Sequence, residues 1–241
     1  DLSLFRNDGR SFNLIAKNFP FPFERHVFGV LINCFEMKDL FTLFRTSLAG
    51  LRVLLLMTLV LGLAYPLVVT GVAQVAFPWQ ADGALVTATG AHTTDRDEAV
   101  GAALIGQVND DEGLFHNRPS AAGDGYDMLG TYGTNLGPLN PDLVASIEAL
   151  KAEIAQREGV AEADVPADAV TSSASGLDPH ISPAYAEIQV ARVAAANGLS
   201  EETVRRLVEE HTDGRTLGVL GEPHVNVLLL NIAVLAAAKA A

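Results

Sequence analysis

The chain has 241 residues, of which 49% are hydrophobic, and its formal net charge is −13. That length allows one or two domains with a sizeable core, and the mean hydropathy of +0.25 indicates a membrane-associated stretch. The acidic balance excludes a protein that binds nucleic acid through phosphate contacts, because those contacts need clustered Lys and Arg. Cys34 is the only cysteine, so an intramolecular disulfide and a thiolate metal cluster are excluded as well.

An uncharged stretch covers residues 53–81 and has no polar stripe. It exceeds the roughly 20 residues that a helix needs to cross a bilayer, so we predict a transmembrane helix over residues 53–77. Pro66 lies in mid-span and is expected to kink this helix by removing one backbone hydrogen bond. Trp79, at the far end, is typical of an anchor at the membrane interface.

The charges around this stretch predict its orientation. Lys38, Arg45 and Arg52 precede it and Asp82 follows it. The positive-inside rule therefore places the N-terminus in the cytoplasm and the following acidic body outside. A cleaved signal peptide is the alternative, but its apolar region is usually about 7–15 residues long and no A-x-A site follows the run, which favours a retained anchor.

The residues before the span divide into two parts. Residues 1–41 are aromatic-rich without clean periodicity and differ from the rest of the chain. We interpret them as an N-terminal extension and expect the natural start at or near Met37. An amphipathic helix on the membrane surface is the alternative, although Pro20 and Pro22 interrupt it. Residues 42–52 then form a short cytoplasmic lead.

The body, residues 80–238, begins with patterns typical of short strands. Residues 84–90 and 102–108 are predicted strands, and residues 109–141 read as a loop rich in Gly, Asn, Pro and Asp. Residues 167–176 are predicted to form a further strand that runs into a turn.

Four helices are expected in the second half of the body. The first has Asn140 as its N-cap and ends at Gly159. The others are predicted over residues 183–197, from Ser200 to before Gly214, and from Pro223 through the apolar C-terminal run, which is too short to span a membrane. The fold class is therefore mixed α/β (α+β): one N-terminal transmembrane helix and a single extracytoplasmic domain with short strands and about four helices.

Residues 175–182, SGLDPHIS, place Asp178, His180 and Ser182 close together. A catalytic triad needs groups that converge from separate elements, whereas these residues are neighbours in sequence. The pairs Asp178-Pro179 and Ser182-Pro183 instead resemble two helix-start signals. His180 then bonds a loop carbonyl or faces a partner subunit. The alternative is a membrane-anchored extracytoplasmic hydrolase that uses Asp178 and His180.

Other motifs carry little chemistry. The histidines show no i,i+3 or i,i+4 pair for zinc, and no P-loop occurs. The loop GTYGTNLGPLNP contains Gly133, Asn135 and Gly137, whose backbone N–H groups would suit a nucleotide phosphate. A plain glycine-rich turn explains the same residues.

Six stretches in order make the chain similar to a known family: LVLGLAYPLVVTGVAQVAFPWQADG, LIGQ, FHNRPSAAGDGYD, TNLGPLNPDL, SGLDPHISPAYAEIQVARVA and LVEEHTDGRTLGVLGEPHVNVLLLN. They resemble the KdpC family, the C subunit of the high-affinity ATP-driven potassium pump of bacteria and archaea. The resemblance covers residues 43–235 and excludes residues 1–41.

This resemblance implies an inner-membrane complex with three partners: a channel-like potassium-translocating subunit, a P-type ATPase subunit and a very small single-span subunit. The chain has neither a TVGYG filter nor a D-K-T-G motif, so it is expected to be non-catalytic by itself, with K⁺ handled by the complex. Gly62, Pro66, Gly71 and His180 are its candidate interface residues.

The family is also described as a catalytic chaperone that raises the affinity of the ATPase subunit for ATP and binds ATP itself. On this chain, that role would fall to the loop with Gly133, Asn135 and Gly137. The charges argue against ATP binding by this loop. Residues 53–241 carry a net charge of −15 and are predicted to lie outside the cell, away from cytoplasmic ATP. A simpler mechanism is that the body covers the outer mouth of the channel-like subunit.

Overall fold

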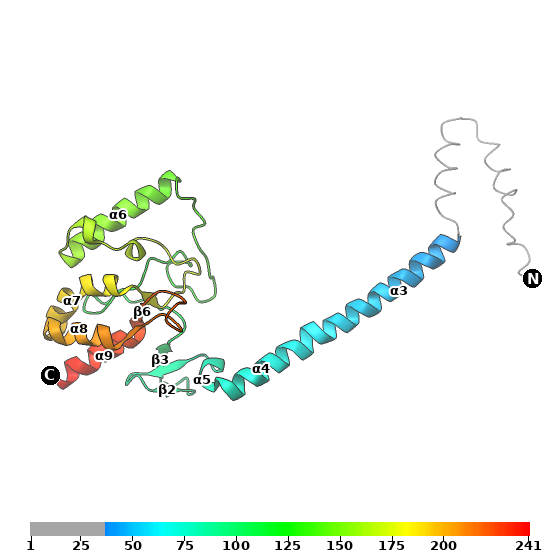
Figure 1. The fold of residues 1–241 in the computed structure, drawn as a ribbon, viewed down its shortest axis with the longest axis horizontal. Helices are drawn as coiled ribbons and strands as arrows, with labels where there is room; N and C mark the ends of the chain where they lie inside the picture. Colours follow the sequence, from blue (N-terminus) through cyan, green and yellow to red (C-terminus); the bar gives the residue numbers. More distant parts are fainter. Residues whose placement is uncertain (1–36) are drawn as a thin grey trace, which may run out of the picture. The chain divides into compact units, whose positions relative to one another are not determined.

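The computed structural model describes residues 37–241, and residues 1–36 of the predicted extension lie outside them. Its first elements are α3 (Met37–Leu59), the π-helical turn η2 (Val60–Ala64) and α4 (Tyr65–Ala76) (Figure 1). Together they make one apolar helix whose span-like part is Leu40–Ala76, 37 residues, long enough to cross a membrane. The expected single long apolar helix is therefore present.

The turn η2 lies directly before Pro66. Within it, the Tyr65 N–H donates to the Val60 carbonyl, five residues earlier, instead of to the carbonyl four residues earlier as in an α-helix. Proline lacks an N–H and its ring crowds the preceding turn of an α-helix. The wider π turn gives the chain room for that ring.

A short helix, α5 (Pro78–Ala81), connects this long helix to the body. The Trp79 Nε1–H donates to the Leu85 carbonyl at 2.8 Å, and the indole stacks on His92 with 3.6 Å between ring centroids. Trp79 is thus half-buried against the body, and its indole N–H is already used within the chain.

Two small antiparallel sheets form the β-structure of the body. The first has the order β2-β1-β3 and the second the order β4-β6-β5. The strands are β1 (Leu85–Thr87), β2 (His92–Thr93), β3 (Ala99–Ala102), β4 (His180–Ile181), β5 (Thr212–Asp213) and β6 (His224–Asn226). Strands this short cannot form a core alone, so the sheets depend on the helices that cover them.

Four long helices carry most of the packing: α6 (Pro141–Glu158), α7 (Pro183–Asn197), α8 (Glu201–Glu210) and α9 (Val227–Ala240). Helix α7 packs on α6, α8 and α9, and these elements lie side by side in Figure 1. The predicted caps at Asn140 and Ser182 and the predicted helix start at Ser200 are confirmed: these three side chains accept from main-chain N–H groups in the first turns of α6, α7 and α8. Gly159 and Gly198 end α6 and α7 in the left-handed conformation that glycine tolerates best.

Helix α9 lies between the two hydrophobic clusters of the body. Its Leu230 and Val234 are buried in the larger cluster, which also contains residues of α6, α7 and α8. Its Ile232 is buried in the smaller cluster against β1. A helix covered on several sides needs apolar residues all round, which explains why the C-terminal run lacks a polar face.

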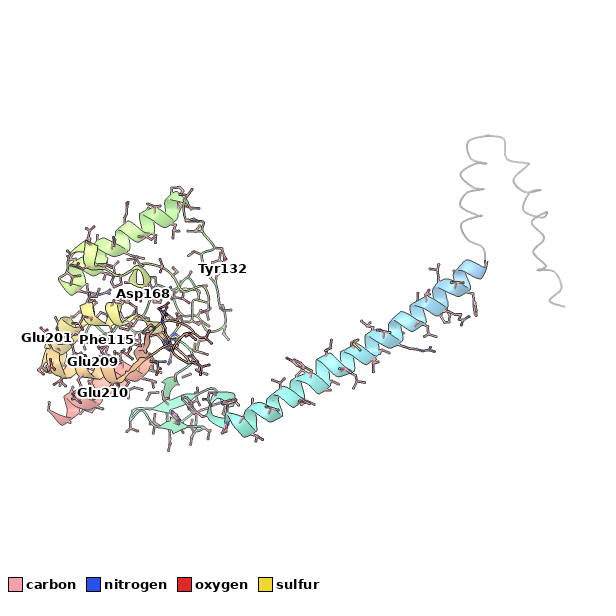
Figure 2. All side chains as sticks on the ribbon, viewed as in Figure 1. Phe115, Tyr132, Asp168, Glu201, Glu209 and Glu210 are labelled. Carbon is pink, nitrogen blue, oxygen red and sulfur yellow. The ribbon has the colours of Figure 1, made fainter. Side chains whose placement is uncertain are left out.

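Two asparagines interrupt that run and connect α9 to the rest of the body. Asn226 caps the helix by accepting from the Leu229 N–H, and its Nδ2 donates to the Ala103 carbonyl at 2.7 Å. Asn231 accepts from the Phe115 N–H at 2.8 Å and donates to the Phe115 carbonyl at 3.0 Å. Phe115 itself is fully buried within the helical part of the body (Figure 2).

Two of the strand predictions were wrong in position or type. The strand predicted over residues 102–108 is β3 (Ala99–Ala102), because the chain turns after Ala102 so that the Gly106 N–H reaches the Leu177 carbonyl. The strand predicted over residues 167–176 is a 3-10 turn, Ala167–Ala169, followed by irregular chain. Ser and Asp side chains in that stretch bond nearby main chain, which competes with a strand ladder.

Two predicted helix starts also differ from the structure. The last helix begins at Val227 and not at Pro223, because residues 224–226 pair with β4 and β5. Asp178 caps no helix. Its Oδ1 accepts from the His180 N–H at 3.0 Å in a turn that leads into β4.

Replacement of Asn231 tests its role as a connection. Asn231→Leu keeps a similar volume but leaves the buried N–H of Phe115 without this partner, while the Phe115 carbonyl still accepts from Asn109 Nδ2. We expect the free energy of unfolding of the full chain in detergent to fall by about 1–3 kcal/mol, measured by thermal denaturation. The matched control, Gln156→Leu on the exposed face of α6, should change it by less than about 0.5 kcal/mol. Equal loss in both variants would contradict the role.

Candidate functional site

The structure separates Ser182 of the SGLDPHIS motif from Asp178 and His180. The Ser182 hydroxyl donates to Asp168 Oδ1 at 2.8 Å and accepts from the Tyr185 N–H at 3.0 Å. The Ser182 N–H also donates to Asp168 Oδ2 at 2.8 Å. Both bonding directions of this hydroxyl are therefore used at the start of α7, and sequence reasoning had not found Asp168 as its partner (Figure 2).

Asp178 and His180 remain together and are joined by Arg118. Asp178 Oδ2 accepts from Arg118 Nη1 at 3.0 Å, and Asp178 Oδ1 lies 3.1 Å from His180 Nδ1. The edge of the His180 ring meets His224 of β6, with 4.5 Å between centroids. Burial raises the pKa of Asp178, but hydrogen bonds from His180 and the charges of His180 and Arg118 outweigh it, so this pKa is lowered and the carboxylate is ionised at neutral pH.

This cluster connects loops that are distant in sequence. Arg118 Nη2 also donates to the Thr171 carbonyl, and the Arg118 carbonyl accepts from the Tyr126 hydroxyl at 2.7 Å. Burial is the main cause of the raised pKa of Tyr126, so its phenol stays protonated. No hydroxyl within residues 37–241 is hydrogen-bonded to His180.

The candidate nucleotide loop lies against residues 174–175. Thr131 and Tyr132 donate to the Ser175 carbonyl from a hydroxyl and an N–H, and a Cβ added at Gly133 would lie 2.6 Å from the Ala174 carbonyl oxygen. Asn135 adopts a left-handed φ of 53° and its Nδ2 donates to the Gly133 carbonyl. Tyr132 lies on the outer loop in Figure 2. Gly133 and Asn135 thus have structural roles in a loop packed on its neighbour.

A groove of about 280 Å³ lies elsewhere in the body, between α9 and residues 100–109. Its lining is mainly apolar and none of the nucleotide-loop residues belongs to it. Asn109, Asn117 and Asn231 line it, but their amide groups already donate to main-chain carbonyls. Lys239 is the one charged residue of its lining, and the rest of the groove offers a charged ligand little.

A buried ion cluster was missed by sequence reasoning. The Glu158 carboxylate, with a fully buried side chain, accepts from Arg157 Nε at 2.8 Å and from Arg192 Nε at 2.9 Å. Arg192 also donates to the carbonyls of Glu112 and Leu114. The cluster ties α6 and α7 to the loop before Phe115. Sequence spacing gave no signal for it because its members come from distant segments.

His116 lies beside this cluster. Its Nε2 is buried and has no hydrogen-bond partner among the described residues. Burial, followed by the charges of Arg157 and Arg192, lowers the pKa of His116 below its ordinary value of 6.5. The imidazole is therefore neutral in the folded chain at neutral pH.

The interface candidates in the long helix are open to a neighbour. A Cβ added at Gly62 would meet only Thr58 Cγ2, at 3.8 Å, and one added at Gly71 would meet nothing within 4 Å. The most apolar part of this helix is fully exposed among the described residues. No other described element packs on it within its own unit.

The body also has exposed apolar residues on two ordered loops. Between β5 and β6, Leu217 is 87% exposed and adopts a left-handed φ of 54°, which is uncommon for a leucine. Val219 and Leu220 are exposed beside it in sequence, and the Arg215–Glu222 ion pair closes the base of this hairpin. On the other loop, Leu129 is 99% exposed. Exposed groups of this kind are typical of interaction surfaces.

Comparison with known proteins identifies the family. A family described as "KdpC: K+-transporting ATPase, c chain" matches residues 47–236. The chain belongs to the KdpC family. A "Potassium-transporting ATPase KdpC subunit" of Kineococcus radiotolerans is 51% identical over 196 residues, 81% of this chain and 96% of the relative. A protein of the same name from Sorangium cellulosum is 52% identical over 191 residues, 77% of this chain and 97% of the relative.

The KdpC match covers both the exposed apolar helix and the exposed apolar loops of the body. It includes Gly62, Pro66 and Gly71 of the long helix and both exposed loops of the body. The name that these relatives carry describes each of them as a subunit of a potassium-transporting ATPase. The described residues contain no group of three or more His, Cys, Asp or Glu that could hold a metal ion.

The glycines of the candidate nucleotide loop provide a matched test of its structural role. Gly133→Ala should destabilise the full chain by about 1–3 kcal/mol, because the added Cβ meets the Ala174 carbonyl oxygen. Gly137→Ala adds a Cβ with nothing within 4 Å and should be close to neutral in thermal denaturation. Two equally stable variants that both lose nucleotide binding would contradict this reading and support a phosphate site.

His116 predicts a pH dependence of stability. Because its folded pKa is lowered, the unfolded chain takes up this proton first as the pH falls through 6.5. Its stabilising contribution is complete above pH 6.5 and is lost between 6.5 and the lowered folded pKa. Unfolding midpoints of the full chain between pH 7.5 and 5.5 should fall less steeply in His116→Gln than in wild type. Parallel pH profiles would contradict the neutral buried imidazole.

Proposed function

We propose that this chain is a non-catalytic accessory subunit of an ATP-driven, high-affinity potassium uptake pump in the bacterial inner membrane. The observation that carries the proposal is the uncovered apolar helix Leu40–Ala76 in a chain of the KdpC family. A single helix cannot enclose an ion pathway, and no hydroxyl among the described residues is hydrogen-bonded to His180 as a nucleophile would be. The chain's part is therefore to assemble and stabilise the subunits that transport K⁺.

The proposed orientation has the N-terminus in the cytoplasm and the body outside. Arg45 and Arg52 lie in the first half of the long helix, and Asp82 follows its end. Cationic residues before the span and an acidic residue after it support this direction. Residues 53–241 carry a net charge of −15, so they would present an acidic surface outside the cell.

The proposed partners follow from the two kinds of open surface. The span would pack against the channel-like subunit at Gly62, Pro66 and Gly71, where small residues and the π turn allow close approach. The body would cover the outer mouth of that subunit through the exposed hairpin, with His180 near its base. The P-type ATPase subunit and the very small single-span subunit complete the complex.

An effect on ATP affinity would pass through the assembled complex and not through nucleotide bound to this body. The body, placed outside, cannot meet cytoplasmic ATP. Its acidic charge opposes a polyphosphate, and the loop with Gly133 and Asn135 is packed on residues 174–175. This account keeps a chaperone role for the chain while assigning the nucleotide to the ATPase subunit.

Affinity purification tests the proposal. The tagged full chain would be recovered from membranes of potassium-starved cells in mild detergent. We expect a channel-like subunit and a P-type ATPase to co-purify, with ATP hydrolysis that K⁺ stimulates. A mutated tag on the same chain controls for non-specific capture. Recovery of the chain alone, with no ATPase activity, would contradict the proposal.

If the exposed hairpin contacts a partner subunit, changing its apolar side chains should weaken assembly of the complex without lowering the stability of this chain. Leu217→Asn should leave the thermal midpoint of the chain unchanged or slightly higher, because Asn tolerates the left-handed φ and the side chain is exposed. Recovery of the partner subunits should fall severalfold, because an apolar contact residue has been lost. Unchanged recovery would exclude the hairpin from the interface.

A further inference from the structure

The turn η2 changes the hydrogen bonding in the middle of the span. The Tyr65 N–H donates to the Val60 carbonyl, whereas in an α-helix it would donate to the Leu61 carbonyl. The residue that would reach the Leu61 carbonyl in the π pattern is Pro66, which has no N–H. Neither pattern therefore supplies the Leu61 carbonyl with a donor from its own helix.

An unpaired carbonyl is costly at this depth. Leu61 lies between Arg52 and Asp82, within the stretch that has no charged residue. Lipid chains cannot donate a hydrogen bond, and a backbone polar group left unsatisfied in hydrocarbon costs several kcal/mol. The Leu61 carbonyl is therefore stabilised by any hydrogen-bond donor that reaches it from outside the helix.

Two residues that carry hydroxyl groups flank Leu61 along the helix. Thr58 is one turn before Gly62, and Tyr65 is one turn after Leu61, with a side chain 63% exposed. Neither hydroxyl has a hydrogen-bond partner among residues 37–241. In the same long helix, the Thr46 hydroxyl donates to the Thr42 carbonyl and Gln74 Nε2 donates to Asp82 Oδ1, while the Thr70 hydroxyl, like those of Thr58 and Tyr65, has no hydrogen-bond partner among the described residues. We name Thr58, Leu61, Gly62 and Tyr65 the polar notch.

We propose that the polar notch receives an uncharged hydrogen-bond donor side chain from a membrane helix of another subunit of the pump. The partial negative charge of the carbonyl oxygen requires an N–H or O–H group, and the apolar surroundings disfavour a charged one. Gly62 leaves the surface open, so that the partner helix can approach closely. This inference rests on the proposed function.

Isosteric substitutions in the full chain test the notch within the assembled complex. Tyr65→Phe and Thr58→Val each remove one hydroxyl without changing the span's length or shape. We expect each to weaken association with the partner subunits by about threefold to tenfold, measured by co-purification against rising detergent. Pro66→Ala, which restores an N–H and permits a regular α-helix, should weaken association as well.

Thr70→Val is the matched control. Thr70 lies five positions after Tyr65 and faces away from it, so loss of its hydroxyl should leave association unchanged. If Tyr65→Phe, Thr58→Val and Pro66→Ala all assemble as well as this control, the polar notch is overturned while the proposed function stands. If the wild-type chain recovers no partner at all, both are overturned.

A photoreactive amino acid in place of Tyr65 identifies the occupant directly. Illumination of the assembled complex in its native membrane should produce an adduct with a peptide of another subunit, located by mass spectrometry. The same substitution at Thr70 gives the background. An adduct with lipid alone at position 65 would overturn the inference.

Discussion

The body depends on how a nearly all-apolar helix, α9, is fixed among its neighbours. Hydrophobic contact alone does not set the axial position of such a helix, because many apolar contacts of similar size are available. Asn226 and Asn231 fix the axial position of α9 through directional hydrogen bonds. Asn226 donates to the Ala103 carbonyl beside the first sheet, and Asn231 bonds both main-chain groups of Phe115. Two amides thereby connect the small sheet, the long central loop and the helical layer.

Buried polar groups of the body mostly bond within it: the side chains of Asn226, Asn231, Ser182 and Glu158 all have partners in the chain. His116 Nε2 and Arg118 Nε are the buried exceptions among the described residues. In the span, the Thr58 and Tyr65 hydroxyls have no partner among the described residues, and Pro66 cannot supply the Leu61 carbonyl with a donor. A polar group that is unsatisfied inside a bilayer favours association with whatever can satisfy it. The polar notch therefore favours contact with a neighbouring membrane helix.

The sequence predicted elements whose signals are local. Charge-free length predicted the long helix, and the Asn140 and Ser182 caps with Gly159 and Gly198 predicted the limits of α6 and α7. The errors arose where distant contacts decide. The chain after Ala102 turns to reach Leu177, and residues 224–226 pair with β4 and β5 before α9 begins. The Arg118–Asp178 and Glu158–Arg192 pairs join residues 60 and 34 positions apart, which no periodicity encodes.

The position of the body outside the membrane is the claim on which the proposed partners and the exclusion of ATP both rest. Labelling of intact cells with a membrane-impermeant maleimide tests it in two single-cysteine chains, both with Cys34→Ser: Leu129→Cys at a fully exposed loop position, and Ser47→Cys at an exposed position of the predicted cytoplasmic lead. The account predicts that the thiol at position 129 reacts in intact cells, whereas the thiol at position 47 reacts only after lysis in denaturant. Reaction of the thiol at position 47 in intact cells, with the thiol at position 129 protected until lysis, would contradict it.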